Sequence, residues 1–192
     1  MEWLVVGLGN PGSQYEHTRH NIGQMVVAGC SESAGVGFQK FKSHGVIASL
    51  AHPSGLTLRL AALSSYMNRS GGPVQAMLAF HKIPPKQLVV VHDDLDLPFG
   101  VVRLKFGGGH AGHNGLKDIQ RALGTPDFTR VRVGIGRPED PRPVADYVLQ
   151  RFSPGHHEQL LEIIRLACDA VEAVVTEGLT AAQQKIHPPR PS

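Results

Sequence analysis

Several features that define common classes of protein are missing from this sequence of 192 residues. It has only two cysteines, Cys30 and Cys168, which lie far apart in the chain and in no metal-ligand spacing. This pattern argues against a disulfide framework and a zinc site, and it fits a reducing compartment. The run from Met1 to Gly7 has no basic leader and is too short for a signal peptide or a membrane span. We therefore expect a cytoplasmic protein without a membrane segment.

Motifs of several enzyme classes are absent as well. The sequence has neither the H-E-x-x-H pair of zinc proteases nor a nucleophile elbow, and Lys117-Asp118 stands where a P-loop would carry Lys followed by Ser or Thr. The segment Gly7 to Gly12 has the G-x-G-x-x-G spacing of dinucleotide-binding folds. However, residues 13–20 lack the apolar period of a helix, and the acidic residue that binds ribose is missing. These observations argue against a nucleotide cofactor.

What is present is typical of a globular domain, with 41% hydrophobic and 18% charged residues. A chain of this length buries a sizeable core without metals or disulfides. Strand-like patterns occupy residues 3–8, 46–50, 56–63, 88–92, 101–106 and 128–135, and helical patterns occupy residues 22–34, 74–82, 116–123 and a long segment that opens at Ser153-Pro154. They predict a single-domain α/β globule over residues 1–186, with a mixed, mostly parallel β-sheet flanked by helices. The Pro-rich segment 187–192 is expected to be a frayed tail.

Basic residues gather in sequence around a glycine-rich centre. The formal net charge of +3 is compatible with a polyanionic partner. The cluster consists of Arg103, Lys105, Lys117, Arg121, Arg130, Arg132 and Arg137. A solvated surface and a phosphate site explain such a cluster about equally well. The segment Gly107 to Gly115, followed by a helix, has the composition of a loop that binds an anion through main-chain N–H groups, although a flexible surface loop is the alternative.

His20 is the side chain best placed to act as a base. Histidine has an unperturbed pKa near 6.5, so it accepts protons near neutrality. The buried strand that ends in His92-Asp93-Asp94 brings acids to the edge of the sheet, where Asp93 could orient the imidazole. The few asparagines, among them Asn10, Asn68 and Asn114, offer neutral amides that both donate and accept hydrogen bonds. Turn formation is the alternative role for each of them.

The acidic run and two nearby histidines suggest a second interpretation. Asp93, Asp94 and Asp96, with His110 and His113, have the ligand types of a metal-dependent hydrolase. Against this alternative, both histidines lie in a glycine-rich loop, where their spacing defines no common face. The metal-dependent hydrolase therefore remains the less favoured hypothesis.

Together these segments resemble the bacterial-type peptidyl-tRNA hydrolase family along nearly the whole chain. The matching segments are Gly7-Leu8-Gly9-Asn10-Pro11-Gly12, Tyr15, Thr18-Arg19-His20-Asn21-Ile22-Gly23, Tyr66-Met67-Asn68, Ser70-Gly71, His92-Asp93-Asp94-Leu95-Asp96-Leu97-Pro98, Gly112-His113-Asn114-Gly115-Leu116, Arg132-Val133-Gly134-Ile135-Gly136-Arg137-Pro138 and Tyr147-Val148-Leu149. Several long motifs in the same order make a chance match implausible.

The resemblance implies a function and a set of site residues. It implies hydrolysis of the ester bond in peptidyl-tRNA, with His20 as the general base, Asp93 as its partner, and Asn10 distinguishing N-blocked from free aminoacyl groups. It implies a substrate site lined by Tyr15, Tyr66, Met67, Asn68, His113 and Asn114, and a tRNA phosphate held by Lys105 and Arg132. No metal or other cofactor is implied, and the partner is peptidyl-tRNA bound by a monomer.

Two features differ from the family or vary within it. Arg69 stands where the family commonly has an apolar residue, beside the expected pocket. The segment Glu139 to Ala145, rich in proline and charge, covers a region that the family uses as a mobile lid.

Overall fold

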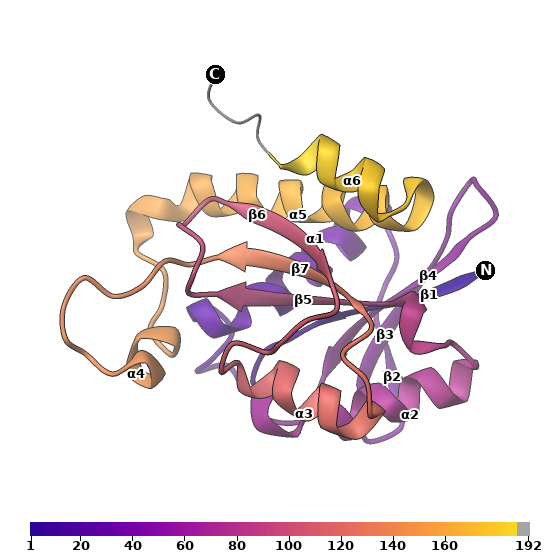
Figure 1. The fold of residues 1–192 in the computed structure, drawn as a ribbon, viewed down its shortest axis with the longest axis horizontal. Coiled ribbons are helices and arrows are strands. Elements are labelled where there is room, and N and C mark those ends of the chain that lie inside the picture. Colours follow the sequence, from indigo (N-terminus) through magenta and orange to yellow (C-terminus); the bar gives the residue numbers. More distant parts are fainter. Residues whose placement is uncertain (188–192) are drawn as a thin grey trace.

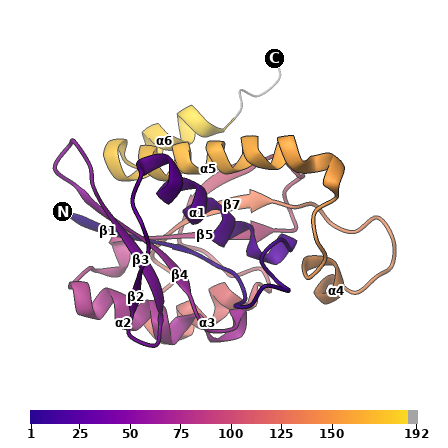
Figure 2. The same ribbon diagram turned by 180° about the vertical axis from the view of Figure 1, so that it is seen from behind.

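The computed structural model describes residues 1–187, which form a seven-stranded sheet with helices packed on both faces (Figures 1 and 2). The strands are β1 (Glu2–Gly7), β2 (Gln39–Phe41), β3 (Gly45–Ala51), β4 (Thr57–Leu63), β5 (Leu88–Asp94), β6 (Val102–Phe106) and β7 (Thr129–Gly134). Their order across the sheet is β2-β3-β4-β1-β5-β7-β6. This arrangement confirms the single α/β domain that the sequence predicts.

Strand direction divides the sheet into a centre and two margins. The central strands β4, β1, β5 and β7 pair in parallel, whereas β2–β3, β3–β4 and β6–β7 pair antiparallel. The central strand β5 is a continuous apolar run from Leu88 to Val91 that is fully buried, as expected for a parallel strand with both faces covered. The mixed sheet therefore has its parallel part where the strands are most apolar.

Helices cover the two faces in separate layers. The α-helices are α1 (Ile22–Ala34), α2 (Gly71–His81), α3 (Asn114–Leu123), α4 (Val144–Val148), α5 (His157–Glu177) and α6 (Leu179–Ile186). The 3-10 helices are η1 (Arg19–Asn21), η2 (Met67–Arg69), η3 (Pro85–Gln87) and η4 (Pro154–His156). Helices α1, α5 and α6 lie on one side of the sheet, and α2 and α3 lie on the other (Figures 1 and 2). Successive residues of a strand face opposite sides of the sheet. Val5 therefore packs in the core beneath α1 and α5, and Leu4 packs in the core beneath α2 and α3.

The elements absent from the sequence-based prediction are short or weakly patterned. Strand β2 has three residues, two of them exposed, and helix α4 has five residues inside a segment rich in proline and charge. Helix α2 begins at Gly71, three residues before its apolar pattern. Gly71 is required there because a Cβ atom would lie 2.3 Å from the main-chain oxygen of Asp118 in α3. Packing between helices thus overrides the low helix propensity of glycine.

The expectation that Cys30 and Cys168 are unpaired is wrong for this structure. Cys30 in α1 and Cys168 in α5 form a disulfide, and their Cα atoms are 5.6 Å apart. The two helices pack closely at Gly29, where a Cβ atom would lie 2.6 Å from Ile164. Separation along the chain is no guide to distance when two helices cross in this way.

The described residues end close to the sheet. The His187 ring accepts a hydrogen bond of 3.0 Å from the main-chain N–H of Leu104 in β6. The rest of the tail expected from sequence, residues 188–192, lies outside the described residues. None of the helices within residues 1–187 has the length and apolar character needed to cross a membrane.

Candidate active site

The candidate site lies at one edge of the sheet, where three parallel strands end. Asn10 follows β1, Met67 follows β4, and Asp93 lies near the end of β5. Carboxyl ends of parallel strands are where ligand sites of α/β proteins usually form. In Figure 1 the arrowheads of β5 and β7 point toward this edge and toward α4. The topology therefore gathers residues that are far apart in sequence.

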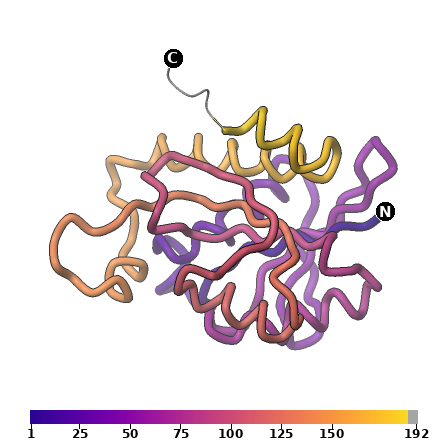
Figure 3. The backbone as a smooth tube through the Cα atoms, viewed as in Figure 1, coloured from indigo at the N-terminus to yellow at the C-terminus, as the bar shows by residue number. Residues whose placement is uncertain are grey.

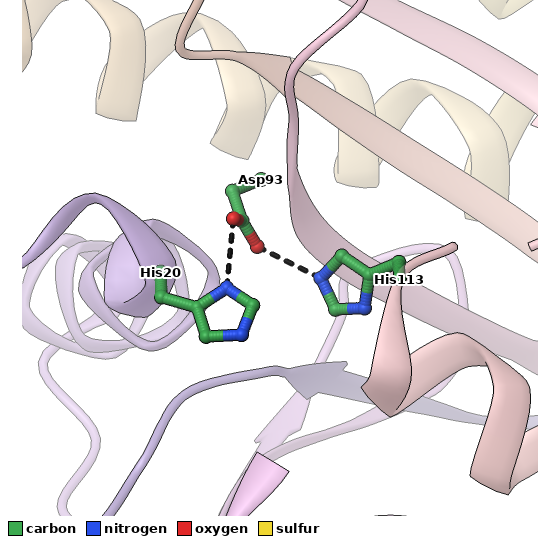
Figure 4. Close-up of side chains that lie close together, drawn as sticks. All are labelled: His20, Asp93 and His113. Carbon is green, nitrogen blue, oxygen red and sulfur yellow. Dashed lines mark hydrogen bonds and ion pairs between the residues drawn. The ribbon is translucent and has the colours of Figure 1, made fainter. Parts of the chain in front are cut away.

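His20, Asp93 and His113 form the centre of the site (Figure 4). Nδ1 of His20 lies 2.8 Å from Oδ2 of Asp93, and Nε2 of His113 lies 2.8 Å from Oδ1 of the same carboxylate. Asp93 is buried, with 3% of its side chain exposed, whereas His20 retains 14% exposure. The carboxylate therefore binds two imidazoles at once. The His20 ring is slightly more exposed to solvent than the His113 ring.

The hydrogen bonds around His113 determine where its proton lies. Its Nδ1 accepts hydrogen bonds from the main-chain N–H groups of Gly115 and Leu116, at 3.1 and 3.3 Å. A nitrogen that accepts two hydrogen bonds carries no proton, so Nε2 of His113 carries it and donates to Asp93. The remaining oxygen of Asp93 accepts from Nδ1–H of His20. Nε2 of His20 is left as the basic nitrogen, on the side of the ring away from Asp93 (Figure 4).

Burial and charge shift the pKa values of this centre. Burial by itself lowers the pKa of His20, but the negative charge of Asp93 and the hydrogen bond to it outweigh burial and raise that pKa above 6.5. Burial by itself raises the pKa of Asp93, but attraction to His20 and His113 and their hydrogen bonds lower it below its usual value. The pair therefore holds an ionised carboxylate beside a histidine that is a stronger base than usual.

His92 is a residue of the site that the sequence-based prediction did not include. Its Nδ1–H donates to the main-chain oxygen of Asp93 at 2.8 Å, and its ring packs 5.2 Å from the ring of His113. Burial, followed by the proximity of His113, lowers the pKa of His92 to about 4. His92 is therefore neutral near pH 7. Its position in a buried strand next to Asp93 was the available signal.

Asn10 is held by main-chain contacts that leave one part of its amide free. Its Oδ1 accepts from the N–H of Met67 at 2.7 Å, while its own N–H and C=O bind the side chain of Asn21 at 2.9 Å each. The Nδ2 group, which is the donor end of the Asn10 amide, therefore points away from the N–H of Met67. Asn10 is 8% exposed, so this donor has a fixed direction.

Close packing, and not nucleotide binding, explains the glycine spacing near Asn10. A Cβ atom at Gly7 would lie 2.1 Å from the main-chain oxygen of Gly23 in α1, and one at Gly9 would meet the side chains of Asn21 and Gln24. Both glycines let α1 approach the end of β1 and place η1, which carries His20. The packing of α1 on β1 therefore accounts for both glycines.

A second group of predicted residues consists of Tyr15, Tyr66, Met67 and Asn68. The rings of Tyr15 and Tyr66 meet edge to face with centroids 6.4 Å apart, and Tyr66 is 54% exposed. Met67 is buried, and its sulfur packs on Gly115, where a Cβ atom would lie 2.6 Å away. Gly115 also adjoins His113, so Met67 packs beside the His20–Asp93–His113 group. Asn68 is exposed on η2, as is Arg69.

A cavity of about 250 Å³ opens beside His20 and has a basic wall. Of the predicted residues, His20, Asp93, Lys105, His113, Asn114 and Arg132 line it, whereas Asn10, Tyr15, Tyr66, Met67 and Asn68 do not. Lys105 is exposed, and Nε of Arg132 forms an ion pair of 2.8 Å with Asp94. Arg130 also lines this cavity, a position that the charge pattern did not single out.

The geometry does not support the metal-dependent alternative. Asp94 pairs with Arg132 and Asp96 with Arg137, while the His110 ring accepts from the N–H of Gly112. Within residues 1–187, the one His/Cys/Asp/Glu group close enough to share a cation is His20, Asp93 and His113. Its facing atoms already form the two N–H···O hydrogen bonds described above. The proposed ligand set therefore does not assemble.

Helix α4 closes one side of the cavity and is joined to the segment before His20. Val144, Ala145 and Val148 of α4 contribute to the lining. Thr18 and Arg151 form an antiparallel bridge, and the Arg19 guanidinium donates to the main-chain oxygen of Tyr147 and lies 4.2 Å from its ring centroid. The chain between β7 and α4 projects from the body as an open loop (Figure 3). The loop and α4 together border the site.

The fold is that of an α/β protein, and its site holds a His–Asp pair of the kind that activates water in hydrolases. Residues 4–192 match the family described as peptidyl-tRNA hydrolase. A peptidyl-tRNA hydrolase of Pseudarthrobacter chlorophenolicus is 50% identical over 187 residues, covering 97% of this chain and 95% of that protein, and one of Leifsonia xyli is 49% identical over 189 residues, covering 96% of each. The chain belongs to the peptidyl-tRNA hydrolase family.

A solved structure agrees with this assignment. The crystal structure of peptidyl-tRNA hydrolase from Acinetobacter baumannii has a TM-score of 0.89 and 37% sequence identity to this chain. The match covers 99% of this chain and 96% of that one. Fold and family therefore agree along the full described length.

Proposed function

We propose that this chain hydrolyses the ester between the peptide and the 3′ end of tRNA in peptidyl-tRNA, with His20 as the general base. The observation that carries this proposal is the pair His20–Asp93, in which Asp93 is held from its other side by His113. The family membership supplies the substrate class. Recycling of tRNA from aborted translation follows from that activity.

The reaction needs no covalent intermediate. Nε2 of His20 takes a proton from a water molecule, whose oxygen attacks the ester carbonyl and forms a tetrahedral oxyanion. When the oxyanion collapses, the bond to the ribose oxygen breaks, and the imidazolium of His20 returns the proton to that oxygen. The products are a peptide with a free carboxyl group and tRNA with a free ribose hydroxyl. Asp93 stabilises the imidazolium in between.

Neutral amides surround the reacting atoms in this proposal. The Nδ2 group of Asn10 donates to the peptide part of the substrate, which would favour an N-blocked aminoacyl group. Asn68 and Asn114 offer further donors and acceptors. Tyr15 and Tyr66 provide aromatic surface for the peptide or the terminal nucleotide, with Met67 and His113 behind them.

The basic wall would bind the nucleic acid part of the substrate. Lys105 and Arg132 are the residues that we assign to a tRNA phosphate, since both line the cavity that contains His20. We propose that the enzyme acts as a monomer. We place the enzyme in the cytoplasm, where its substrate arises.

The decisive experiment is hydrolysis of a purified N-acetyl-aminoacyl-tRNA with and without a chelator. We expect wild-type turnover that persists in excess chelator, and loss of most turnover in His20→Ala. His157→Ala, an exposed histidine at the start of α5, is the matched control and should behave as wild type. Absence of wild-type turnover would refute the proposed activity, and turnover abolished by the chelator but unaffected in His20→Ala would refute the mechanism.

A further inference from the structure

Arg130 is a fully buried cation without an acidic partner among the described residues. It lies in β7, is 2% exposed, and its guanidinium is 4.7 Å from the centroid of the Phe128 ring. Three main-chain oxygens accept from it: Gly109 at 2.6 Å, Gly108 at 3.0 Å and Pro126 at 3.1 Å. The side chain thus binds the glycine-rich loop to β7.

The charge of Arg130 is not explained by stability alone. Burying an ionised group without an opposite charge is unfavourable, and carbonyl dipoles offset only part of that free energy. In addition, Nε of Arg130 is buried without a hydrogen-bond partner within residues 1–187. An apolar side chain of similar volume would avoid burying the charge, but it would leave three main-chain oxygens without this donor. The guanidinium orients the main-chain groups that it binds, and this orientation offers a functional reason for its charge.

The contacts of Arg130 determine which way two peptide groups of the loop face. In a trans peptide the N–H points opposite to the preceding C=O, and none of the described peptide bonds is cis. Because the oxygens of Gly108 and Gly109 point at Arg130, the N–H groups of Gly109 and His110 point away from it. Neither N–H donates a hydrogen bond to another described residue. Gln120 also donates to the oxygen of Gly108, which reinforces this orientation.

The ammonium group of Lys105 lies beside Gly108 of the same loop. Lys105 is paired with Arg130 across β6 and β7, and a Cβ atom at Gly108 would lie 2.5 Å from its ammonium nitrogen. Lys105, Gly109, His110 and Arg130 all line the cavity that contains His20. An ammonium group and two free N–H groups at one wall are suited to a phosphate.

The N-terminus of α3 does not serve this purpose. The sequence suggested that the helix following the loop binds an anion through its first N–H groups. In the structure, Nδ1 of His113 accepts from the N–H groups of Gly115 and Leu116 and occupies that position. The part of the loop available to an anion is therefore the Gly109–His110 part.

We infer that Arg130 is a positioning residue for substrate binding: it orients the Gly108–Gly109 and Gly109–His110 peptide groups so that their N–H groups, with the Lys105 ammonium, bind a phosphate of the tRNA. The inference rests on the proposed function for the identity of the substrate, but not for the existence of the anion site. Arg130 acts through the loop, because its guanidinium N–H groups are bound to main-chain oxygens.

The first test uses inorganic phosphate and the full chain labelled with 15N. The amide resonances of Gly109 and His110 are followed by NMR during a phosphate titration at fixed pH and ionic strength. We expect both to shift in a saturable way in the wild type, and the apparent affinity to fall about tenfold in Arg130→Gln. Arg165→Gln, an exposed arginine of α5, is the control for loss of one positive charge. No response of either amide in the wild type would overturn the inference, whatever the activity of the enzyme.

The second test removes an N–H without changing Arg130, in case Arg130→Gln does not fold. Gly109→Pro removes one of the two donors, whereas Gly109→Ala keeps it, and a Cβ atom at Gly109 meets no other atom within 4 Å. The readout is kcat and KM for N-acetyl-aminoacyl-tRNA compared with the same aminoacyl ester of adenosine, which lacks phosphate. We expect Gly109→Pro to raise KM for the tRNA substrate about tenfold more than Gly109→Ala does. The kcat values of the two variants on this substrate should be similar.

Comparison of the two substrates separates a phosphate site from a folding effect. Arg130→Gln and Gly109→Pro should lower kcat/KM for the tRNA substrate more than for the adenosine ester, and Arg130→Lys, which keeps the charge but not the planar fork, should restore only part of the loss. Equal losses on both substrates, or full rescue by Arg130→Lys, would overturn the positioning role. Failure of the wild type to cleave either substrate would count against the proposed function, while the NMR result would still decide the anion site.

Discussion

His113 and Asp93 are joined by a hydrogen bond whose direction is determined on the opposite side of the imidazole ring. Two N–H groups at the start of α3 bind Nδ1 of His113, so its proton lies on Nε2 and points at Asp93. Asp93 then has one oxygen left for His20. The helix terminus thereby helps to keep Asp93 ionised and His20 in the tautomer whose Nε2 is basic.

Removal of the base should abolish most turnover. General-base assistance contributes about 10² to 10⁴ in rate, so His20→Ala should lose a factor in that range. Binding of deacylated tRNA should stay nearly intact, since the basic wall is unchanged. Single-turnover kinetics and a binding titration check the two statements. An active His20→Ala enzyme would rule out this histidine as the base.

The pH dependence of kcat/KM should report the pKa of His20. The base must be neutral, so kcat/KM falls as the pH drops through a pKa that lies above 6.5 in the wild type. In Asp93→Asn the attraction is lost and burial remains, so the acidic limb should move to lower pH while the maximal rate falls. A limb that stays at the wild-type pH in Asp93→Asn would contradict the pairing.

The same pair affects stability in a defined pH window. Because the pKa of His20 is raised above its unfolded value, its contribution is fully present below about pH 6.5 and is lost as the pH rises through the folded pKa. Asp93 contributes in the opposite sense, since its lowered pKa gives stability that is lost in acid. Urea unfolding of the wild type and of Asp93→Asn across pH would show both slopes.

Lys105 and Arg132 should differ in their effect on tRNA affinity. Each phosphate contact that is lost reduces counterion release and flattens the dependence of affinity on salt. Arg132 is partly neutralised by Asp94, so we expect Lys105→Ala to flatten that dependence more than Arg132→Ala. Binding constants over a salt series check this order. Unchanged salt dependence in both variants would assign these residues to the solvated surface.

Asn10 should control the choice between blocked and free aminoacyl groups. The wild type should cleave N-acetyl-aminoacyl-tRNA at least about tenfold faster than the unblocked ester, a difference of about 1.4 kcal/mol in the barrier. A free α-amine is largely cationic near neutral pH, and placing it in a partly dry site is unfavourable. Asn10→Ala should narrow the ratio, mainly by slowing the blocked ester. Equal rates on the two esters in the wild type would contradict this basis of selection.

The disulfide should matter for stability and not for chemistry. It joins residues separated by 138 positions, and bonds that close long loops stabilise proteins by about 2 to 4 kcal/mol. Cys30→Ser should lower the free energy of unfolding by an amount in that range under oxidising conditions and by little with a reductant present. kcat should be equal in both forms, because neither cysteine lines the cavity that contains His20. Chemical denaturation with and without dithiothreitol checks this.

Much of the fold was predictable because local patterns and packing agree. Helix α1 spans the residues that its pattern predicts, and β3 and β4 form a hairpin from the strand-like patterns at 46–50 and 56–63. The motif residues of the centre, His20 and Asp93, were also predictable, since both belong to distinctive sequence motifs. The metal-dependent alternative failed because carboxylates near arginines pair with them, and sequence spacing does not reveal such pairing.

Other parts of the site could not be predicted because they depend on distance across the fold. The second hydrogen bond to Asp93 comes from His113, which the sequence suggested only as a substrate-binding residue or a metal ligand. The role of Arg130 as a buried ligand of main-chain oxygens is invisible in a list of basic residues. The same limit explains why the contact between Cys30 and Cys168 was missed.

The bridge between Thr18 and Arg151 has a consequence for synthesis of the chain. The strand pairing that supports the segment of His20 forms only after Arg151, more than a hundred residues further along the chain, has also emerged from the ribosome. A partly made copy that ends before that point lacks this bridge, so the segment that carries His20 gains this support only late in synthesis.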